Sequence, residues 1–199
     1  MENFADILFK GQVKAEQARL GTAERFEKAY ANRFRDGFGP DEKAFIESRD
    51  TFYMATTSED GWPYVQHRGG PRGFLKVFSP TELGMADYTG NAQYVSTGHL
   101  KADGRISLIL MDYPRKARLK ILGKATMIDA AEDPDLAAQL AVEGQGPVER
   151  LLKITLSAFD WNCPKYITER FTMDEVAAMV GPRIAALEAR IKELEGTQT

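Results

Sequence analysis

Cationic and glycine residues gather in one short segment of this sequence, 65–74, VQHRGGPRGF. His67 and Arg68 are adjacent, and the two-residue period of a strand would turn one of them toward a core and the other outward. Glycines directly after a strand let another group approach the backbone closely and leave N–H groups available as donors. The segment therefore predicts either a binding edge for an anionic or flat ligand or an ordinary surface hairpin loop.

Hydroxyl and amide side chains follow in the segment DYTGNAQYVSTGH, which joins the end of a predicted strand to the start of a predicted helix. The positive end of a helix beside hydroxyl groups is suited to binding an anion. The alternative is simple capping of this helix by Asn91. Because Asp87 is unhelpful beside a phosphate, we expect it to meet a ribose-like hydroxyl or a backbone turn. The polar residues after it are Tyr88, Thr89, Asn91, Ser96 and Thr97.

Two later segments add cations and aromatic rings. In PRKARLK, Arg118 has the planar fork that suits a phosphate or the carbonyl edge of a flat ring, although the stretch also fits a solvated strand edge. In DWNCPKYI, Trp161 is suited to stacking on a ring or to anchoring a core or interface, and Lys165 to donating a hydrogen bond. Cys163 has no neighbouring base in the sequence that would activate it as a nucleophile.

The sequence shows no catalytic or metal-binding motif of its own. Histidine, glutamate and aspartate do not recur at metal-ligand spacing, no serine triad motif is present, and no carboxylate pair is placed for glycoside hydrolysis. Together the four segments supply cations, amides and aromatic rings. Such groups are suited to holding a cofactor that brings its own reactivity.

Composition restricts the class of protein. The chain has 199 residues and a net charge of −3, so it lacks the basic face that nucleic acids require. Its single cysteine excludes an intramolecular disulfide. No apolar run reaches the roughly 20 residues that cross a membrane, and the N-terminus has no secretory signal. We therefore expect a cytoplasmic protein that binds neither nucleic acid nor a membrane.

Hydrophobic periodicity divides the chain into three parts. Apolar residues recur at helical spacing over 1–50, which predicts an N-terminal helical segment. Alternating segments rich in β-branched residues predict six or so antiparallel strands over 51–167, with short turns, in a closed or nearly closed barrel. Two intervening helices are predicted over 91–103 and 133–144, and Gly123 predicts a bulge or bend in the long strand 117–129. Residues 168–199 are predicted to form C-terminal helices. The segments that look like strands are 51–58, 62–67, 74–78, 84–88, 105–113, 117–129 and 151–161.

The C-terminal part carries an apolar stripe on a charged helix. A capping-box pattern at Thr172 begins one predicted helix, and a second follows Pro182. The apolar residues of the second helix fit packing on the chain's own barrel, and they equally fit a contact with another subunit. The stripe consists of Ile184, Leu187, Ile191 and Leu194.

The order of these segments resembles that of a known family. It runs through DGWPYVQHRGGPRGF, LGMADYTGNAQYVSTGHL, GRISLILMDYPRKARLKILGKA and FDWNCPKYI, within about residues 45–167. These stretches are similar to those of the pyridoxamine 5′-phosphate oxidase-like flavin-binding split-barrel proteins, and more narrowly to the predicted flavin-nucleotide-binding proteins. The resemblance implies a mainly β fold with flanking helices (α+β), in which residues 51–167 form a six-stranded antiparallel split barrel. It also implies a homodimer with FMN at the subunit interface.

The resemblance further implies which residues contact FMN. The strand that holds the flavin falls on Gln66 to Pro71, and the phosphate-binding serine falls on Ser96. The oxidase has an arginine where this chain has Gln66, so Arg68, Arg72 or His67 would have to replace it. The implied cofactor-binding residues are Gln66, His67, Arg68, Gly69, Gly70, Tyr88, Thr89, Gly90, Asn91, Ser96, Arg118, Asn162, Cys163 and Lys165.

The implied function is that of an FMN-dependent oxidoreductase whose substrate the sequence does not identify. A small-molecule substrate or a nicotinamide donor would be its partner. Vitamin B6 oxidation is not expected, because the C-terminal segment that completes the oxidase's substrate site has no counterpart in TMDEVAAMVGPRIAALEAR. Two alternatives remain open: a flavin carrier or redox sensor without turnover, and the same barrel holding deazaflavin or haem.

Overall fold

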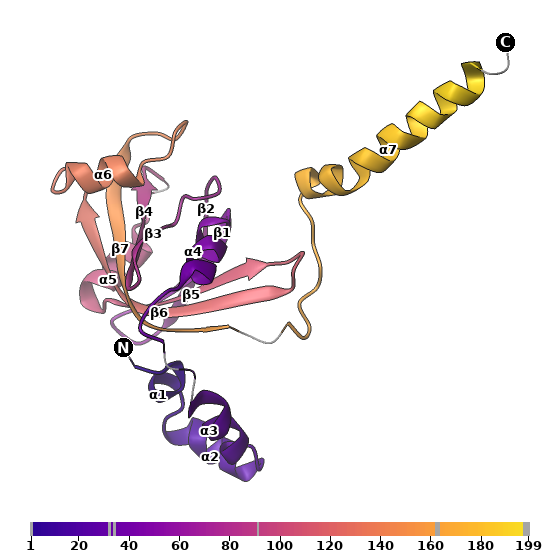
Figure 1. Cartoon of the computed structure of the whole chain (residues 1–199). Coiled ribbons are helices and arrows are strands. Elements are labelled where there is room, and N and C mark those ends of the chain that lie inside the picture. Colours follow the sequence, from indigo (N-terminus) through magenta and orange to yellow (C-terminus); the bar gives the residue numbers. More distant parts are fainter. Residues whose placement is uncertain (1, 32, 34, 91, 162–163, 197–199) are drawn as a thin grey trace. The chain divides into compact units, whose positions relative to one another are not determined.

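One sheet of seven strands forms the centre of the fold in the computed structural model, which describes residues 2–31, 33, 35–90, 92–161 and 164–196 (Figure 1). The strands lie in the order β2-β1-β5-β6-β7-β4-β3. The pairs β1–β2, β1–β5, β3–β4, β4–β7 and β6–β7 are antiparallel. The strands are β1 (Thr51–Thr57), β2 (Pro63–Gly69), β3 (Lys76–Ser79), β4 (Glu82–Tyr88), β5 (Arg105–Asp112), β6 (Ala117–Asp129) and β7 (Val148–Trp161).

The strand count corrects the expectation of six strands. β3 has four residues and lies at one end of the sheet order, where it forms a tight hairpin with β4. The sequence pattern already indicated a strand at 74–78, so only the expected number was wrong and no segment was missed. The sheet order ends at β2 and β3 without closing, which also corrects the expectation of a closed or nearly closed barrel. The mainly β architecture with antiparallel pairing and flanking helices is as predicted.

The alternating sequence pattern places one face of the central strands in the core. Phe52 and Met54 on β1 are fully buried, and they lie opposite Leu110 and Leu108 on β5. Burial of one such side chain stabilises the fold by about 1.5–3 kcal/mol. These pairs explain why β1 and β5 lie inside the sheet, where both strand edges are hydrogen-bonded.

Gly123 allows β6 to bend, as the sequence predicted. The register between β6 and β7 shifts between Leu122 and Gly123. A Cβ atom at position 123 would lie 2.6 Å from the carbonyl oxygen of Thr155. Glycine is therefore required for this close approach of two backbones, and the irregularity bends a strand of 13 residues.

Helices precede, interrupt and follow the strands. Those labelled α1 to α4 lie within the first fifty residues, where the apolar spacing predicted helical structure. The helix expected over 91–103 begins at Val95, and the one expected over 133–144 ends at Leu140. The helices are α1 (Phe4–Leu8), α2 (Gly11–Arg19), α3 (Ala23–Ala31), α4 (Pro40–Glu47), α5 (Val95–Ala102), α6 (Pro134–Leu140) and α7 (Met173–Gly196).

The C-terminal helix differs from the sequence prediction of two helices. It continues through Pro182 as the single helix α7. A proline inside a helix removes one backbone hydrogen bond and crowds the preceding turn, at a cost of about 3 kcal/mol. Strong helix formers such as alanine, leucine, glutamate and arginine surround it and keep the residues on both sides helical.

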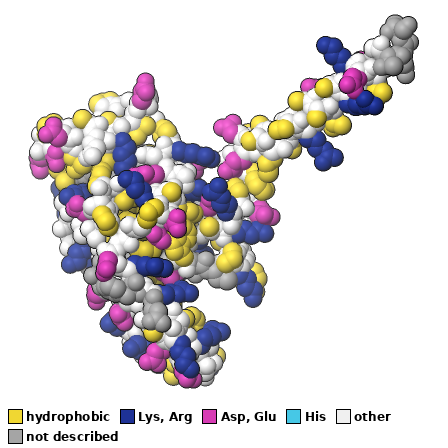
Figure 2. All heavy atoms as spheres, viewed as in Figure 1, with side chains coloured by type: hydrophobic (Ala, Val, Ile, Leu, Met, Phe, Trp, Pro, Cys, Tyr) yellow, Lys and Arg dark blue, Asp and Glu magenta, His cyan; other side chains and the backbone are white. Residues whose placement is uncertain are grey.

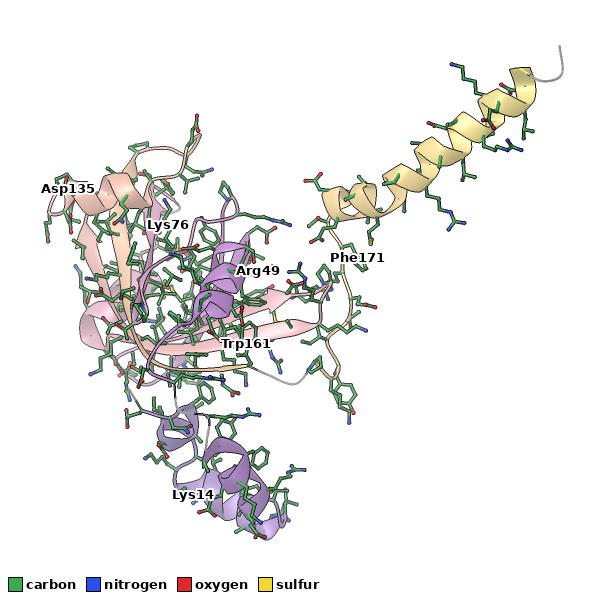
Figure 3. The ribbon with its side chains drawn as sticks, viewed as in Figure 1. Lys14, Arg49, Lys76, Asp135, Trp161 and Phe171 are labelled. Carbon is green, nitrogen blue, oxygen red and sulfur yellow. The ribbon has the colours of Figure 1, made fainter. Side chains whose placement is uncertain are left out.

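Trp161, at the end of β7, anchors helix α4 to the sheet. Its Nε1 donates a hydrogen bond of 2.7 Å to Glu42, and its ring meets Phe45 edge-to-face at 4.7 Å. The guanidinium of Arg49 lies 4.8 Å from the same phenyl ring; Trp161 and Arg49 are both labelled in Figure 3. Of the two roles predicted for Trp161, the structure shows the anchoring one.

The chain divides into two compact units. One comprises Met1–Met111 with Arg118–Cys163, and the other comprises Asp112–Ala117 with Pro164–Thr199. The helices α1 to α6 and the sheet, except Asp112 at the end of β5 and Ala117 at the start of β6, belong to the first unit, and α7 belongs to the second. Among the helices that the structure describes, none combines the length and apolarity needed to cross a membrane.

Candidate functional site

A pocket of about 320 Å³ lies among β2, the end of β4, the start of α5 and the start of β7. It brings together five residues that the sequence assigned to a cofactor, namely Gln66, Arg68, Tyr88, Gly90 and Ser96. Its volume is near the lower end of the range of small-molecule sites. The other described residues of its lining are Tyr64, Asp87, Ala92, Gln93, Tyr94, Val95, Thr97 and Arg150.

Strand alternation decides which side chains of β2 face this pocket. Tyr64, Gln66 and Arg68 are half-buried on one face of the strand, whereas Val65 and His67 are exposed on the other. The prediction that His67 and Arg68 point to opposite faces is confirmed. Arg68 is the cation that enters the pocket.

His67 lies outside the pocket, against the neighbouring strand. Its Nε2 is 2.5 Å from the hydroxyl of Thr51 on β1. His67 lines a second hollow of about 300 Å³, together with Gly69 and Gly70, and Arg68 borders both hollows. The glycine-rich segment therefore lies next to the pocket through Arg68, without contributing its glycines to the lining.

Asp87 is the centre of the charge arrangement in the pocket. Nη1 of Arg68 donates to its Oδ1 at 2.8 Å, and Nε and Nη2 of Arg150 donate to its Oδ2 at 3.1 and 2.9 Å. The three side chains are largely buried, at 18%, 10% and 17% exposure for Arg68, Asp87 and Arg150. The expected partners of Asp87, a ribose-like hydroxyl or a backbone turn, are replaced by two guanidinium groups. The carboxylate holds both in fixed orientations.

Arg68 retains unused donor capacity. Its Nε is buried and has no hydrogen-bond partner in the described part of the chain. A buried polar group without a partner costs about 1–3 kcal/mol unless a ligand or water completes it. Arg68 therefore brings a positive charge to the pocket lining and has one buried N–H that makes no hydrogen bond within the described part of the chain.

Arg150 is more fully engaged than Arg68. In addition to its contacts with Asp87, its Nη1 donates to Glu149, and its guanidinium lies 4.5 Å from the ring of Tyr94. Burial opposes its charge, but the hydrogen bond to Asp87 is among the effects that outweigh burial and raise the pKa of Arg150 above its ordinary value. Arg150 therefore stays protonated and keeps Asp87 in place.

The start of helix α5 forms another wall of the pocket. The residue before it, Tyr94, is in the left-handed region with φ of 52° and makes no side-chain capping bond. Val95, Ser96 and Thr97 of the first turn line the pocket, and N–H groups of a first turn have no partners within their own helix. Ser96 is buried and donates through its hydroxyl to Oε1 of Gln66 at 2.8 Å. The positive end of a helix thus lies beside Arg68.

The remaining predicted residues are less closely connected with the pocket. The hydroxyl of Tyr88 accepts a hydrogen bond from the N–H of Val142 at 2.8 Å, so it fixes the loop after α6. Thr89 is not part of the lining, and Arg118 lies on β6, three strands from β2. Lys165 belongs to the second unit of the chain. Three predicted residues, Asn91, Asn162 and Cys163, lie outside the described residues.

Sequence reasoning missed Arg150 and Tyr94. Arg150 lies directly opposite Asp87 in the antiparallel register of β4 and β7. These two residues are 63 positions apart, and neither strand shows in its own sequence which residue it will face. A charged residue on the inward face of a buried strand was the available signal, because such a charge needs a partner. Among the described residues, no group of three or more His, Cys, Asp or Glu side chains could hold a metal ion.

Comparison with known proteins identifies the fold. A family model described as Pyridoxamine 5′-phosphate oxidase matches residues 38–159. HupZ of Group A Streptococcus has a similar structure, with a TM-score of 0.50 and 14% identity, over 67% of this chain and 99% of its own. A variant of HupZ with one histidine replaced by alanine aligns with a TM-score of 0.50 and 15% identity, over 62% and 98%. At such identities these structures show a shared fold and no more.

A third solved structure belongs to a Lactobacillus delbrueckii protein described as a pyridoxamine 5′-phosphate oxidase. It aligns with a TM-score of 0.49 and 19% identity, over 63% of this chain and 95% of its own. No curated protein matches the sequence.

Proposed function

The chain belongs to the pyridoxamine 5′-phosphate oxidase family, and from this membership we propose that it binds FMN, with the phosphate end in the pocket between β2 and α5. The observation that carries the proposal is the buried guanidinium of Arg68, with an unpartnered Nε, beside the uncapped start of α5. A phosphate accepts several charge-assisted hydrogen bonds, and both groups supply donors for them.

Each residue of the pocket has a specific task in this proposal. Arg68 and the first-turn N–H groups of α5 bind the phosphate, and Asp87 keeps the guanidinium of Arg68 in position. Ser96 orients the side-chain amide of Gln66, which then meets the ribityl chain. The absence of a side chain at Gly90 leaves room for the ligand. We assign His67, Gly69 and Gly70 to the adjoining hollow. The other implied residues, Thr89, Asn91, Arg118, Asn162, Cys163 and Lys165, stay predictions from the family resemblance.

The proposed activity is that of an FMN-dependent oxidoreductase. FMN, when bound, supplies the hydride chemistry. The chain's own contribution is to fix the phosphate end and so determine where the ring lies. The pocket's described lining contains no histidine, lysine or cysteine, and its one carboxylate, Asp87, is held by two arginines.

That lining also favours a second candidate, a flavin-binding protein without turnover, because its single carboxylate is held by two arginines and its described residues include no histidine, lysine or cysteine. Stopped-flow mixing with NADH or NADPH separates the candidates. Reduction of bound FMN on the second timescale supports the oxidoreductase, whereas an unchanged flavin spectrum at every donor concentration supports the carrier or sensor.

We extend the proposal to a homodimer built on split barrels. The outer face of β1 and β2 exposes apolar side chains, with Val65 63% and Tyr53 39% exposed, and Trp62 in the turn between these strands is 76% exposed. Exposed apolar groups that lie together commonly mark protein interfaces. The bend at Gly123 supports the strand curvature that a split barrel requires.

An absorption spectrum and a native mass spectrum of freshly purified protein test the ligand. We expect a yellow protein carrying the mass of FMN, or an apoprotein that takes up added FMN. An absorption spectrum typical of deazaflavin or haem would show that the protein binds that cofactor in place of FMN. Protein that stays colourless in excess FMN, while properly folded by circular dichroism, would contradict the proposal.

A further inference from the structure

Helix α7 presents a seven-residue repeat of exposed apolar side chains. Ile184 and Ile191 are seven residues apart, as are Leu187 and Leu194, and Val180 continues the pattern toward the N-terminus. The exposure of these side chains ranges from 42% for Val180 to 56% for Leu187. The isoleucines occupy the first apolar position of each repeat and the leucines the second, which is the combination that favours two parallel strands of a coiled coil.

The charges beside this stripe distinguish between the possible partners. Arg183 and Arg190 precede the isoleucines, and Glu188 and Glu195 follow the leucines. In a parallel, in-register pair of identical helices, each arginine lies next to the glutamate five positions further along the partner, Arg183 with Glu188 and Arg190 with Glu195. In an antiparallel pair, arginines would face arginines and glutamates would face glutamates. The charges therefore favour the parallel arrangement.

We propose that α7 pairs with α7 of a second copy of this chain as a parallel two-stranded coiled coil. Helix α7 has 24 residues, and Figure 2 shows hydrophobic side chains along it between charged ones. Pro182 is two positions before Ile184, which places it on the outer face of the repeat, where its ring does not obstruct the seam. Arg190 contacts Glu193 of its own helix, but both side chains are about two-thirds exposed, so this pair is weak and rearranges readily.

Such a pair has a two-fold axis along its length, the symmetry that most homodimers have. It depends neither on a contact between sheets nor on any cofactor. Its function would be to hold two chains together independently of the flavin site.

Site-specific cross-linking tests the pairing in the full-length chain. In a Cys163→Ala background, Leu187→Cys places a thiol in the seam, and Ala189→Cys places one on the outer face as a matched control. Equivalent seam positions of a parallel pair come close enough for a disulfide. On mild oxidation we expect Leu187→Cys to form a linked chain pair with at least about 10-fold higher yield than Ala189→Cys. Equal yields, or a Leu187→Cys variant that remains a single chain, would overturn the proposal.

Charge exchange tests the direction of the pair. In the Leu187→Cys background, the double change Arg183→Glu with Arg190→Glu gives one variant, and Glu188→Arg with Glu195→Arg gives another. Each variant alone should lose most of its cross-linking, because like charges then flank the seam. A mixture of the two should regain it as a mixed pair. An equal yield of cross-linked pairs before and after these charge changes would exclude the proposed arrangement. Because the readout is a covalent pair and not flavin content, its failure is distinguishable from failure of FMN binding.

Discussion

At the scale of single residues, the pocket depends on how three charged groups share their hydrogen bonds. Asp87 accepts from both Arg68 and Arg150, yet Arg68 keeps a buried Nε without a partner among the described residues. Since Arg150 directs its donors to Asp87 and Glu149, the two arginines have different roles. In our proposal Arg68 binds the phosphate, while Arg150 has the larger share of the contacts to Asp87.

Replacing Arg68 by alanine should weaken FMN binding with little change in fold. One charge-assisted hydrogen bond contributes about 1.5–3 kcal/mol, so we expect the Kd to rise by about 10-fold to 100-fold. Asp87 retains Arg150 in the variant, which keeps the carboxylate paired. Fluorescence titration with FMN measures the effect, and Arg72→Ala serves as the control, because Arg72 is in the same segment but not in the pocket lining. Equal weakening in both variants would count against a role for Arg68.

Replacing Asp87 by asparagine should destabilise the apoprotein. The change leaves two guanidinium groups facing each other without their carboxylate, and breaking a buried ion pair from one side costs about 3–5 kcal/mol. A bound phosphate group would restore the missing negative charge. We therefore expect FMN to raise the melting temperature of this variant by more than it raises that of the unchanged protein. A smaller rise in the variant would place the phosphate elsewhere.

At the scale of elements, the site depends on close contacts that hold strands and helices in register. Strand β7 pairs with β4 on one side and with β6 on the other, so its register fixes Arg150 opposite Asp87. The glycine in β6 permits the close approach of β6 to β7 where their register shifts. Helix α3 is attached to the far end of β7 through Asp160, which accepts from Tyr30 at 3.0 Å and lies 3.3 Å from Arg33.

Gly123→Ala should destabilise the sheet, because the added methyl group would lie 2.6 Å from a backbone carbonyl oxygen that cannot move easily. Overpacking of this kind costs about 1–3 kcal/mol. Gly98→Ala is the matched control: no atom lies within 4 Å of the new methyl group, and the position is inside α5. It should raise stability by up to about 1 kcal/mol. Urea unfolding of both variants measures the difference, and similar effects of the two would refute the close approach.

The attachment of α3 should weaken at high pH. Burial, followed by the charge and hydrogen bond of Asp160, raises the pKa of Tyr30 above its ordinary value. The folded chain then holds this proton more tightly than the unfolded chain. The resulting stabilisation is complete below the ordinary tyrosine pKa of about 10 and is lost as the pH rises through the raised value.

Urea unfolding midpoints measured between about pH 8 and about pH 11 test this dependence. Tyr30→Phe should flatten the decline at high pH, whereas Tyr166→Phe, a control at a side chain that is 90% exposed, should leave it unchanged. A decline of the same slope in the Tyr30→Phe variant would assign it to other groups.

At the scale of the whole molecule, the two proposed contacts between chains use different surfaces, and a substitution in one of them tests whether the proposed flavin site depends on it. The sheet contact involves the outer face of β1 and β2, and the helix contact involves α7. Val65 is 63% exposed, so Val65→Glu should leave the isolated fold intact while placing a charge in the sheet contact. The variant and the unchanged protein are diluted in parallel, light scattering measures the oligomeric state, and absorbance measures the FMN that stays bound. We expect the variant to lose its flavin at a higher protein concentration than the unchanged protein does. If the variant retains flavin as well as the unchanged protein, flavin binding does not depend on the contact between the outer faces of β1 and β2.

The sequence by itself determined the positions of most strands and helices and the side of a strand on which residues lie, although not the number of strands or the continuity of α7. Alternation placed Arg68 and His67 on opposite faces of β2, and the isolated glycine at position 123 indicated a bend. The spacing of the α7 stripe was also visible, because helical periodicity is a local property. These features follow from neighbouring residues, and the structure retains them.

Only the tertiary structure decided which charges meet. The pairing of Asp87 with Arg150 depends on the register of two strands distant in sequence, which no local pattern specifies. The tertiary structure likewise decided that His67 lies outside the pocket and that Tyr94 borders it. It also decided that Trp161 anchors α4. Long-range pairing is set by the sum of many core contacts, so single positions do not reveal it in advance.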